Sequence, residues 1–300
     1  MSDVTPPPDR PADPVFSLII STIGPAEDLA RGLSSIMAQT FRDFEVIVVD
    51  QNVTDHVRAI TAPFLATGKV HYIKSEVGLS KGRNAGLALA RGTIVGFPDD
   101  DCYYPAPLLE QILQRFASHG DASGICVRCI DYRGYDSAGR SDRRGGLITK
   151  RNVWSRAVSV GMFLKTDATL QAGGFDERIG LGSNSLYLSG EETDLLLTLV
   201  GQGHRIYYDP LLHVFHPPNP PVITPRHIVR SYAYGMGKGL LLRRHEYRHH
   251  HVALHVAKPV LGALVAVLRG NLALARLRIK RAKGRYDGWR SYLPEVADRR

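Results

Sequence analysis

The chain has 300 residues, of which 44% are hydrophobic, so it can bury a sizeable core and is not disordered throughout. Its formal net charge is +9 at pH 7, and residues 252–286 contain no aspartate or glutamate while arginine and lysine accumulate there. This asymmetry indicates an anionic partner, either a membrane surface or a nucleic acid.

The first part of the chain predicts a leader followed by an α/β domain. Residues 1–14 contain five prolines and lack the basic start and apolar run of a secretory signal, so we expect a disordered leader on a cytoplasmic protein. β-rich runs then alternate with helical patterns, which predicts a largely parallel sheet built from βα units. The predicted strands are 15–20, 44–49, 70–73, 94–97 and 124–130, and the predicted helices include 26–39 and 80–90.

Polar residues follow three of these strands at the point where each strand ends. Thr22 follows the first strand, Asp50 the second, and the run 99–101 the fourth. In open α/β sheets this edge is where ligands bind. A single acidic residue after a strand is usually a turn former or a helix cap, but three such strand ends indicate a common site. The glycine signatures of dinucleotide enzymes and P-loop proteins are missing, which argues against both classes.

Asp99, Asp100 and Asp101 directly follow an apolar strand. Three adjacent carboxylates repel one another unless a cation neutralises them, and such hard oxygen ligands suit Mg²⁺ or Mn²⁺. A solvated acidic turn is the alternative interpretation. We favour the metal, because a diphosphate bridged by such an ion becomes a good leaving group.

A second acidic group, Glu191, Glu192 and Asp194, precedes an apolar helical run. Carboxylates in the first turn of a helix are stabilised by its dipole, so one explanation is that these acids only stabilise the start of a helix. These acids also follow the glycine-rich stretch 180–184, which can lie against a ligand and direct a carboxylate at a hydroxyl group. The basic turn 78–86 also suits an anion, although capping of a helix explains it equally well.

The C-x-x-C pair Cys126 and Cys129 is compatible with a zinc or redox site. Zinc would require four ligands, and the surrounding segment has the pattern of a buried strand. We therefore favour structural cysteines in a reducing compartment.

Six motifs occur in a fixed order, and together the chain resembles a family 2 glycosyltransferase with the GT-A fold from residue 15 to about 216. These motifs are Phe16-Ser-Leu-Ile-Ile-Ser-Thr, Gln39-Thr-Phe-x-x-Phe-Glu-Val-Ile-Val-Val-Asp50, Gly78-Leu-Ser-x-Gly-Arg-Asn-Ala-Gly86, Phe97-Pro-Asp-Asp-Asp-Cys102, Gly173-Gly-Phe-Asp176 and Ser189-Gly-Glu-Glu-x-Asp-Leu195. The resemblance implies inverting transfer of a sugar from a nucleoside-diphosphate sugar to a glycan or glycolipid acceptor, as in the making of cell-surface polysaccharide precursors.

The resemblance also implies roles for individual residues. Thr22 and Asp50 would contact the base or ribose of the nucleotide, and Arg83 would lie near the donor with Asp100. Asp99 and Asp101 would hold Mn²⁺ or Mg²⁺ on the diphosphate, with His216 completing the metal shell. Glu192 would be the catalytic base. Asp194 is the second candidate for this role, and Glu191 belongs to the same group of candidate catalytic residues.

Some positions depart from the family pattern. Gln51 stands where a second acid is common, and Glu192 replaces an aspartate, which lengthens the arm of the base by one methylene. Thr198 stands where an arginine often follows the apolar run. The processive Q-x-x-R-W motif is missing, which favours transfer of a single sugar over polymerisation.

The organisation we expect is a catalytic domain over residues 15–225 and a helical, basic region over 226–300. A helix opening at Pro259 would place six apolar residues on one stripe with basic flanks, an interfacial pattern. These residues are Leu261, Leu264, Val265, Leu268, Leu272 and Ile279. The apolar stretch 252–268 is shorter than the ~20 residues of a spanning helix. This region is therefore expected either to lie on the inner face of the cell membrane or to pack on the catalytic domain.

Five histidines between His245 and His255 are interleaved with arginines, so a solvated basic helix is favoured over a metal site. Two rival functions remain. A non-catalytic member of the same fold would lose the acids that this chain retains. A nucleic-acid-binding protein would explain the charge, but no helix-turn-helix, zinc-finger or RNP pattern is present, so no nucleic acid is expected.

Overall fold

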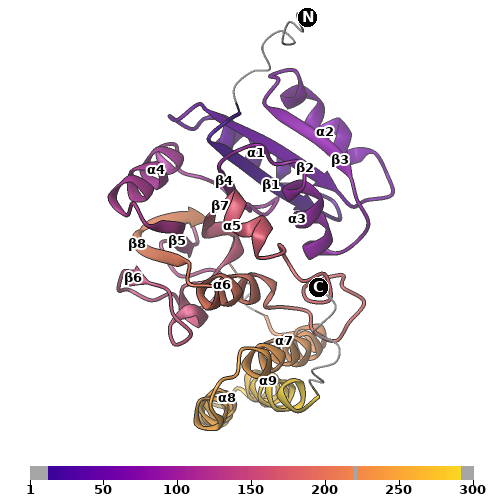
Figure 1. The fold of residues 1–300 in the computed structure, drawn as a ribbon. Coiled ribbons are helices and arrows are strands. Elements are labelled where there is room, and N and C mark those ends of the chain that lie inside the picture. Colours follow the sequence, from indigo (N-terminus) through magenta and orange to yellow (C-terminus); the bar gives the residue numbers. More distant parts are fainter. Residues whose placement is uncertain (1–12, 219–221, 292–300) are drawn as a thin grey trace, which may run out of the picture.

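The computed structural model describes residues 13–218 and 222–291, and its centre is an eight-stranded sheet (Figure 1). The strands lie in the order β3-β2-β1-β4-β7-β5-β8-β6. Neighbouring pairs among β1 to β4 are parallel, as are β5 and β8, whereas β7 is antiparallel to both β4 and β5. The bounds are β1 Phe16–Thr22, β2 Phe44–Asp50, β3 Val70–Lys74, β4 Ile94–Gly96, β5 Ala122–Ile130, β6 Gly146–Leu147, β7 Met162–Lys165 and β8 Arg205–Phe215. The predicted α/β class and the first four strands are confirmed.

Helices flank this sheet. They are α1 Leu29–Met37, α2 His56–Leu65, α3 Leu79–Leu87, α4 Leu108–Ser118, α5 Thr166–Gln171 and α6 Glu191–Gly201. The helix predicted from residue 26 begins three residues later, because Ala26 has a φ of 53°, outside the right-handed helical region. The predicted helix 80–90 is α3.

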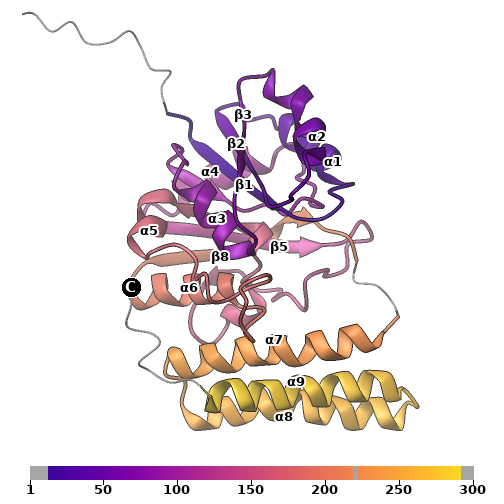
Figure 2. The same cartoon turned by 90° about the vertical axis from the view of Figure 1, so that its right-hand side faces the viewer.

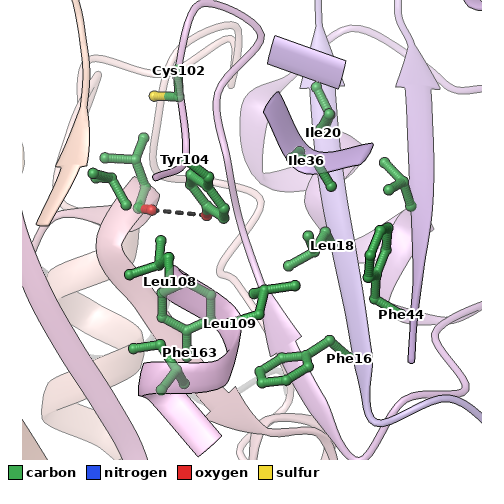
Figure 3. Packing of buried hydrophobic residues seen from close by; sticks show 14 of the residues in the cluster. Phe16, Leu18, Ile20, Ile36, Phe44, Cys102, Tyr104, Leu108, Leu109 and Phe163 are labelled. Carbon is green, nitrogen blue, oxygen red and sulfur yellow. Dashed lines mark hydrogen bonds between the residues drawn. The ribbon is translucent and has the colours of Figure 1, made fainter. Parts of the chain in front are cut away.

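Two apolar cores lie on opposite faces of the sheet, since successive side chains of a strand point to opposite faces. In β1, Phe16, Leu18 and Ile20 enter one core while Ile19 enters the other. Figure 3 shows the first core, in which the buried Tyr104 donates a hydrogen bond to the carbonyl of Val160 at 3.0 Å. Burial on both faces explains why β1 and β2 are mostly apolar.

Three long helices form a separate layer beneath the sheet domain (Figure 2): α7 Pro225–Arg244, α8 His249–Leu268 and α9 Leu272–Arg290. Helices α7 and α9 approach closely through glycines. A Cβ atom on Gly239 would lie 2.3 Å from the carbonyl oxygen of Arg285, and one on Gly284 would lie 2.1 Å from that of Tyr232. Small residues at these positions let the two backbones pack side by side.

Three details predicted for this region are wrong. The helix predicted from Arg226 to His251 is interrupted at 245–248, where Glu246 has a φ of 53°. Pro259 lies inside α8 rather than at its start. The apolar stripe is not continuous either, because the chain turns at Gly270, with a φ of 70°, and Asn271 caps α9 by accepting from the backbone of Leu274.

The apolar stretch 252–268 was expected to be too short to span a membrane, but the helix that contains it is longer than this stretch. Helix α8 has 20 residues with a mean hydropathy of 1.7 and is 22% buried, so by length and composition it is long and apolar enough to cross a membrane. This helix packs against α9 (Figure 2). The leader predicted at 1–14 falls almost entirely outside the described residues.

Candidate active site

The carboxyl ends of β1, β2 and β4 meet at one edge of the sheet, and the predicted polar residues lie there. The hydroxyl group of Thr22 donates to the Asp100 carboxylate, which joins the end of β1 to the loop after β4. Thr22 also pairs with Asp50 in the register of β1 and β2. The parallel order of these strands brings together side chains that lie up to 79 positions apart in the sequence, from Thr22 to Asp101.

Asp50 is completely buried and is held by donors from the neighbouring strand. Its carboxylate accepts from the Tyr72 hydroxyl at 2.6 Å and the Asn52 backbone at 2.9 Å, and it pairs with the Lys74 ammonium at 2.8 Å. Although burial opposes ionisation, the hydrogen bonds from Lys74, Tyr72 and Asn52 hold the pKa of Asp50 below its ordinary value. The sequence reasoning missed Tyr72 and Lys74. Both lie on β3, and the strand-end position of Lys74 was the signal that could have found it.

The three aspartates after β4 carry charge that the protein only partly compensates. Burial, followed by the charges of Asp99 and Asp101, raises the pKa of Asp100 to about 6 despite the hydrogen bond from Thr22. Burial likewise raises the pKa of Asp101, and the nearby His216 opposes this shift. A divalent cation would relieve this repulsion.

The donor atoms at this edge fit such a cation. One ligand atom each from Asp99, Asp101 and Cys102 can be chosen so that all lie within 4.8 Å of one another. Burial raises the pKa of the Cys102 thiol well above its ordinary value, so this group stays protonated and is a poor ligand. The two carboxylates are the oxygen ligands that Mg²⁺ and Mn²⁺ prefer.

His216 approaches the same carboxylates from the end of β8. Its Nε2 lies 3.6 Å from an Asp101 oxygen, and its Nδ1 lies 2.7 Å from the carbonyl oxygen of Pro217. A carbonyl oxygen only accepts, so Nδ1 carries a hydrogen, and Nε2 is the ring nitrogen that faces Asp101. This arrangement orients a histidine for metal binding.

Arg83, from α3, is buried and links two parts of the site. Its guanidinium donates to Asp99 at 3.1 Å, to Glu191 at 3.1 Å and to the hydroxyl of Ser159 at 2.9 Å. Glu191 is thereby engaged as a partner of Arg83. The link holds the start of α6 close to the aspartates, and Ser159 is a further contact that sequence reasoning did not identify.

Glu192 lies at the start of α6, which follows Gly190 in the left-handed conformation with a φ of 106°. Among the described residues, no side chain hydrogen-bonds to the Glu192 carboxylate. Burial, followed by the negative charge of Glu191, raises the pKa of Glu192 to about 8, well above its ordinary value. A carboxyl group with this shift is suited to exchange a proton near neutral pH.

Asp194 has the opposite environment. Its carboxylate pairs with the Arg244 guanidinium at 2.8 Å and with Nε2 of His245 at 2.7 Å, and Arg244 also pairs with Asp176 at 2.9 Å. These contacts connect α6 to the end of α7. The histidine at 245 is therefore not solvated, and His255 packs on Trp154 with ring centroids 5.3 Å apart, so the predicted solvated face is wrong at these two positions.

Comparisons with known proteins identify the family and the fold of this chain. Glycosyl transferase family 2 matches residues 17–173. A PGL/p-HBAD biosynthesis glycosyltransferase of Mycobacterium bovis is 32% identical over 155 residues, which cover 49% of this chain and 59% of that protein. A protein of the same description from Mycobacterium tuberculosis matches to the same extent. The matched region thus spans less than two thirds of these relatives.

Solved structures are similar in fold. TarS of S. aureus, residues 1–349 in complex with UDP-GlcNAc, superposes with a TM-score of 0.57 at 16% identity, covering 90% of this chain and 91% of that one. The mannosyltransferase PcManGT from Pyrobaculum calidifontis, in complex with GDP-Man and Mn²⁺, gives a TM-score of 0.64 at 16% identity, covering 93% and 88%. With the fold, the ordered motifs and the family match in agreement, the chain belongs to glycosyl transferase family 2 and has the GT-A fold.

Proposed function

We propose that this chain is a glycosyltransferase that moves a single sugar from a nucleoside-diphosphate sugar to a hydroxyl acceptor with inversion at the anomeric carbon. The observation that carries the proposal is the convergence of Asp99, Asp101 and His216 near the start of α6. Glu192 at that helix start has no side-chain hydrogen-bond partner within the described part of the chain. The nucleotide-sugar complexes of TarS and PcManGT support this donor class.

The metal in this proposal is Mn²⁺ or Mg²⁺, held by Asp99 and Asp101 with His216 as a third ligand. Bound there, the ion would act as a Lewis acid that stabilises the departing diphosphate. Mn²⁺ in the PcManGT complex supports this assignment. Arg83 keeps Asp99 oriented through its 3.1 Å contact.

At the other end of the donor, Thr22 and Asp50 contact the base or ribose. Asp50 is kept ionised by its hydrogen bonds to Lys74 and Tyr72. Because both of its oxygens are already engaged, a hydroxyl or N–H group of the nucleotide would bind there by replacing one of these contacts. Asp100 accepts from Thr22 and connects this end of the site to the metal ligands.

Glu192 is the general base in this mechanism. Its carboxylate takes the proton of the acceptor hydroxyl, and the oxygen attacks the anomeric carbon from the face opposite the leaving diphosphate. One displacement without a protein nucleophile inverts the configuration. Asp194 is disfavoured as the base because Arg244 and His245 occupy its carboxylate, and Glu191 because Arg83 does.

The acceptor proposed is a glycan or glycolipid, reached by an enzyme that associates with the inner face of the cell membrane. Support comes from the exposed apolar residues of α8, among them Leu261, Leu264 and Leu268, each more than half exposed. The basic residues of α9 would face anionic headgroups, to which each contributes about 1 kcal/mol near the surface.

The test is donor turnover by the purified chain with Mn²⁺ over a panel of nucleotide sugars. Thermal unfolding identifies the donor that stabilises the protein, and product analysis gives the anomeric configuration. Retention of configuration, or binding that does not depend on a metal, would contradict the mechanism. If every nucleotide sugar left the unfolding temperature unchanged, the donor class itself would be wrong.

A further inference from the structure

A large cleft separates the segment 136–155 of the sheet domain from the helical layer. Its volume is about 1130 Å³, and α7, α8 and α9 all contribute to its lining. Ten of the lining residues are lysine or arginine, whereas two, Asp136 and Asp142, are acidic. The cleft is therefore strongly cationic, and it lies outside the set of residues assigned to sugar transfer.

The two acids do not neutralise the cleft, because both are already paired. Asp136 lies 2.8 Å from Arg128, and Asp142 lies 2.8 Å from Arg156, and neither of these arginines lines the cleft. Within 13–218 and 222–291, nine of the ten lining cations form no ion pair, Arg143 being the exception. The positive charge thus remains uncompensated.

The cations are also crowded. Lys238 of α7 lies 4.0 Å from the ring centroid of Trp154. Burial, followed by the positive charges of Arg285, Lys258 and Arg281, lowers the pKa of Lys238 well below its ordinary value. Like charges held in a partly desolvated space repel one another, and a bound anion would relieve that repulsion.

An apolar stripe borders the cleft. Leu254 lines the cleft and is 55% exposed, and Leu261, Val265 and Leu268 follow at intervals of seven, four and three residues, also exposed. At about 100° per residue, these four side chains lie on one side of α8. Lys258, which lines the cleft, is adjacent to that side, so a cationic pocket and an apolar track share one helix.

We propose that this cleft binds the phosphate or diphosphate group of a lipid whose hydrocarbon chain lies along the α8 stripe. Guanidinium and ammonium groups form charge-assisted hydrogen bonds to phosphate oxygens, and the stripe buries the chain. The stripe favours a lipid over a nucleic acid, because a nucleic acid has no hydrocarbon chain to bury against these apolar side chains. The inference deepens the membrane association proposed above and does not depend on the sugar chemistry.

The experiment measures co-sedimentation of the full chain with phosphatidylcholine vesicles, with and without phosphatidic acid. The cleft variant combines Arg144→Gln, Arg151→Gln and Lys258→Gln, three exposed lining residues that form no ion pair in the described chain. The matched control combines Arg269→Gln, Arg276→Gln and Lys280→Gln. These residues are exposed at the end of α8 and on α9, but they do not line the cleft. We expect the cleft variant to bind phosphatidic-acid vesicles about tenfold or more weakly, and the control to lose much less.

Two further arms identify the ligand. Leu261→Ser with Leu268→Ser should weaken vesicle binding but leave the binding of inorganic pyrophosphate, measured by calorimetry, unchanged. Equal losses in the cleft and control variants would overturn the proposal, since diffuse surface charge would then explain binding. Pyrophosphate bound as tightly as vesicles would indicate a soluble phosphate ligand, and displacement of vesicles by an oligonucleotide would indicate nucleic acid; either result overturns the lipid. Donor turnover measured on the same preparations shows separately whether the glycosyltransferase assignment fails.

Discussion

Two carboxylates of α6, only two positions apart, occupy opposite environments. Asp194 is paired on both oxygens, with Arg244 and His245, whereas Glu192 has no side-chain partner among the described residues and a raised pKa. The contacts of Asp194 join the sheet domain to the helical layer, whereas Glu192 lies close enough to Asp99 for the charge of that carboxylate to affect its pKa. The start of α6 thus carries one carboxylate that is paired with the helical layer and one that has no side-chain partner in the described part of the chain.

We propose that compensation of charge by partner side chains, rather than position in the motif, distinguishes the roles of these two carboxylates. A paired buried charge is costly to disturb, because removing one member leaves the other uncompensated. An unpaired carboxyl group costs little structurally to replace, but its proton affinity is tuned by its surroundings. The predictions that follow test this division, beginning with the largest expected effect.

The strongest test removes a metal ligand at the uncompensated edge. Asp101→Ala should lower the rate of transfer by about 10³ or more and abolish metal-dependent donor binding, because charge on the leaving diphosphate would no longer be stabilised. The unfolding temperature should stay the same or rise, since one of three repelling carboxylates is lost. Steady-state kinetics with a Mn²⁺ titration checks this, and retained metal-dependent activity would contradict it.

Glu192→Gln should cut turnover by ~10² or more with little change in donor affinity, because the amide keeps the size of the side chain but cannot accept a proton. Its thermal stability should not fall. The measurement is kcat together with the dissociation constant of the donor. Normal turnover here, combined with an inactive Asp194→Asn enzyme, would show that Asp194 is the base.

Asp194→Ala should act on stability instead. Breaking a buried ion pair typically costs about 3 kcal/mol or more, so we expect a lower midpoint of denaturant unfolding and loosened attachment of α7. Turnover per folded molecule should be largely retained at low temperature. Arg244→Leu is the matched partner, and a double-mutant cycle should show coupling between the two sites.

The raised pKa of Glu192 predicts opposite pH trends for activity and stability. The base works only when deprotonated, so kcat should rise about tenfold per pH unit below its pKa and level off near pH 8. Between the ordinary pKa and this raised value the folded state binds more protons than the unfolded state, so this group's contribution to stability falls as pH rises. Glu192→Gln should remove both slopes, as pH-rate profiles and unfolding at several pH values would show.

The smallest effect is expected at the nucleotide end. Tyr72→Phe removes one of several hydrogen bonds to Asp50, and a single such bond is worth about 1 kcal/mol, so the KM for the donor should rise a few-fold with kcat unchanged. A large fall in kcat would instead place Asp50 in the chemical step. Phe at this position keeps the ring and so controls for packing.

Much of the sheet domain could be predicted because its signals are local. Short apolar runs such as 44–49 and 94–97 predict buried strands, and in a parallel sheet the carboxyl ends of such strands meet at one edge. The placement of Thr22, Asp50 and the three aspartates near one another follows from that rule. The alternating pattern also implied the class of fold before any contact was known.

The pairing of Asp194 and the arrangement of the C-terminal helices depend instead on contacts between segments that are distant in the sequence. Asp194 acquires its role from Arg244 and His245, some 50 positions later, and no spacing in the chain encodes that pairing. The interruptions at 245–248 and at Gly270 divide the basic region into the three helices α7, α8 and α9. Their packing places Lys258 and Arg285 in one cleft with the segment 136–155. Periodicity describes one helix at a time, so the uniform basic stretch in the sequence could not reveal the cleft that it lines.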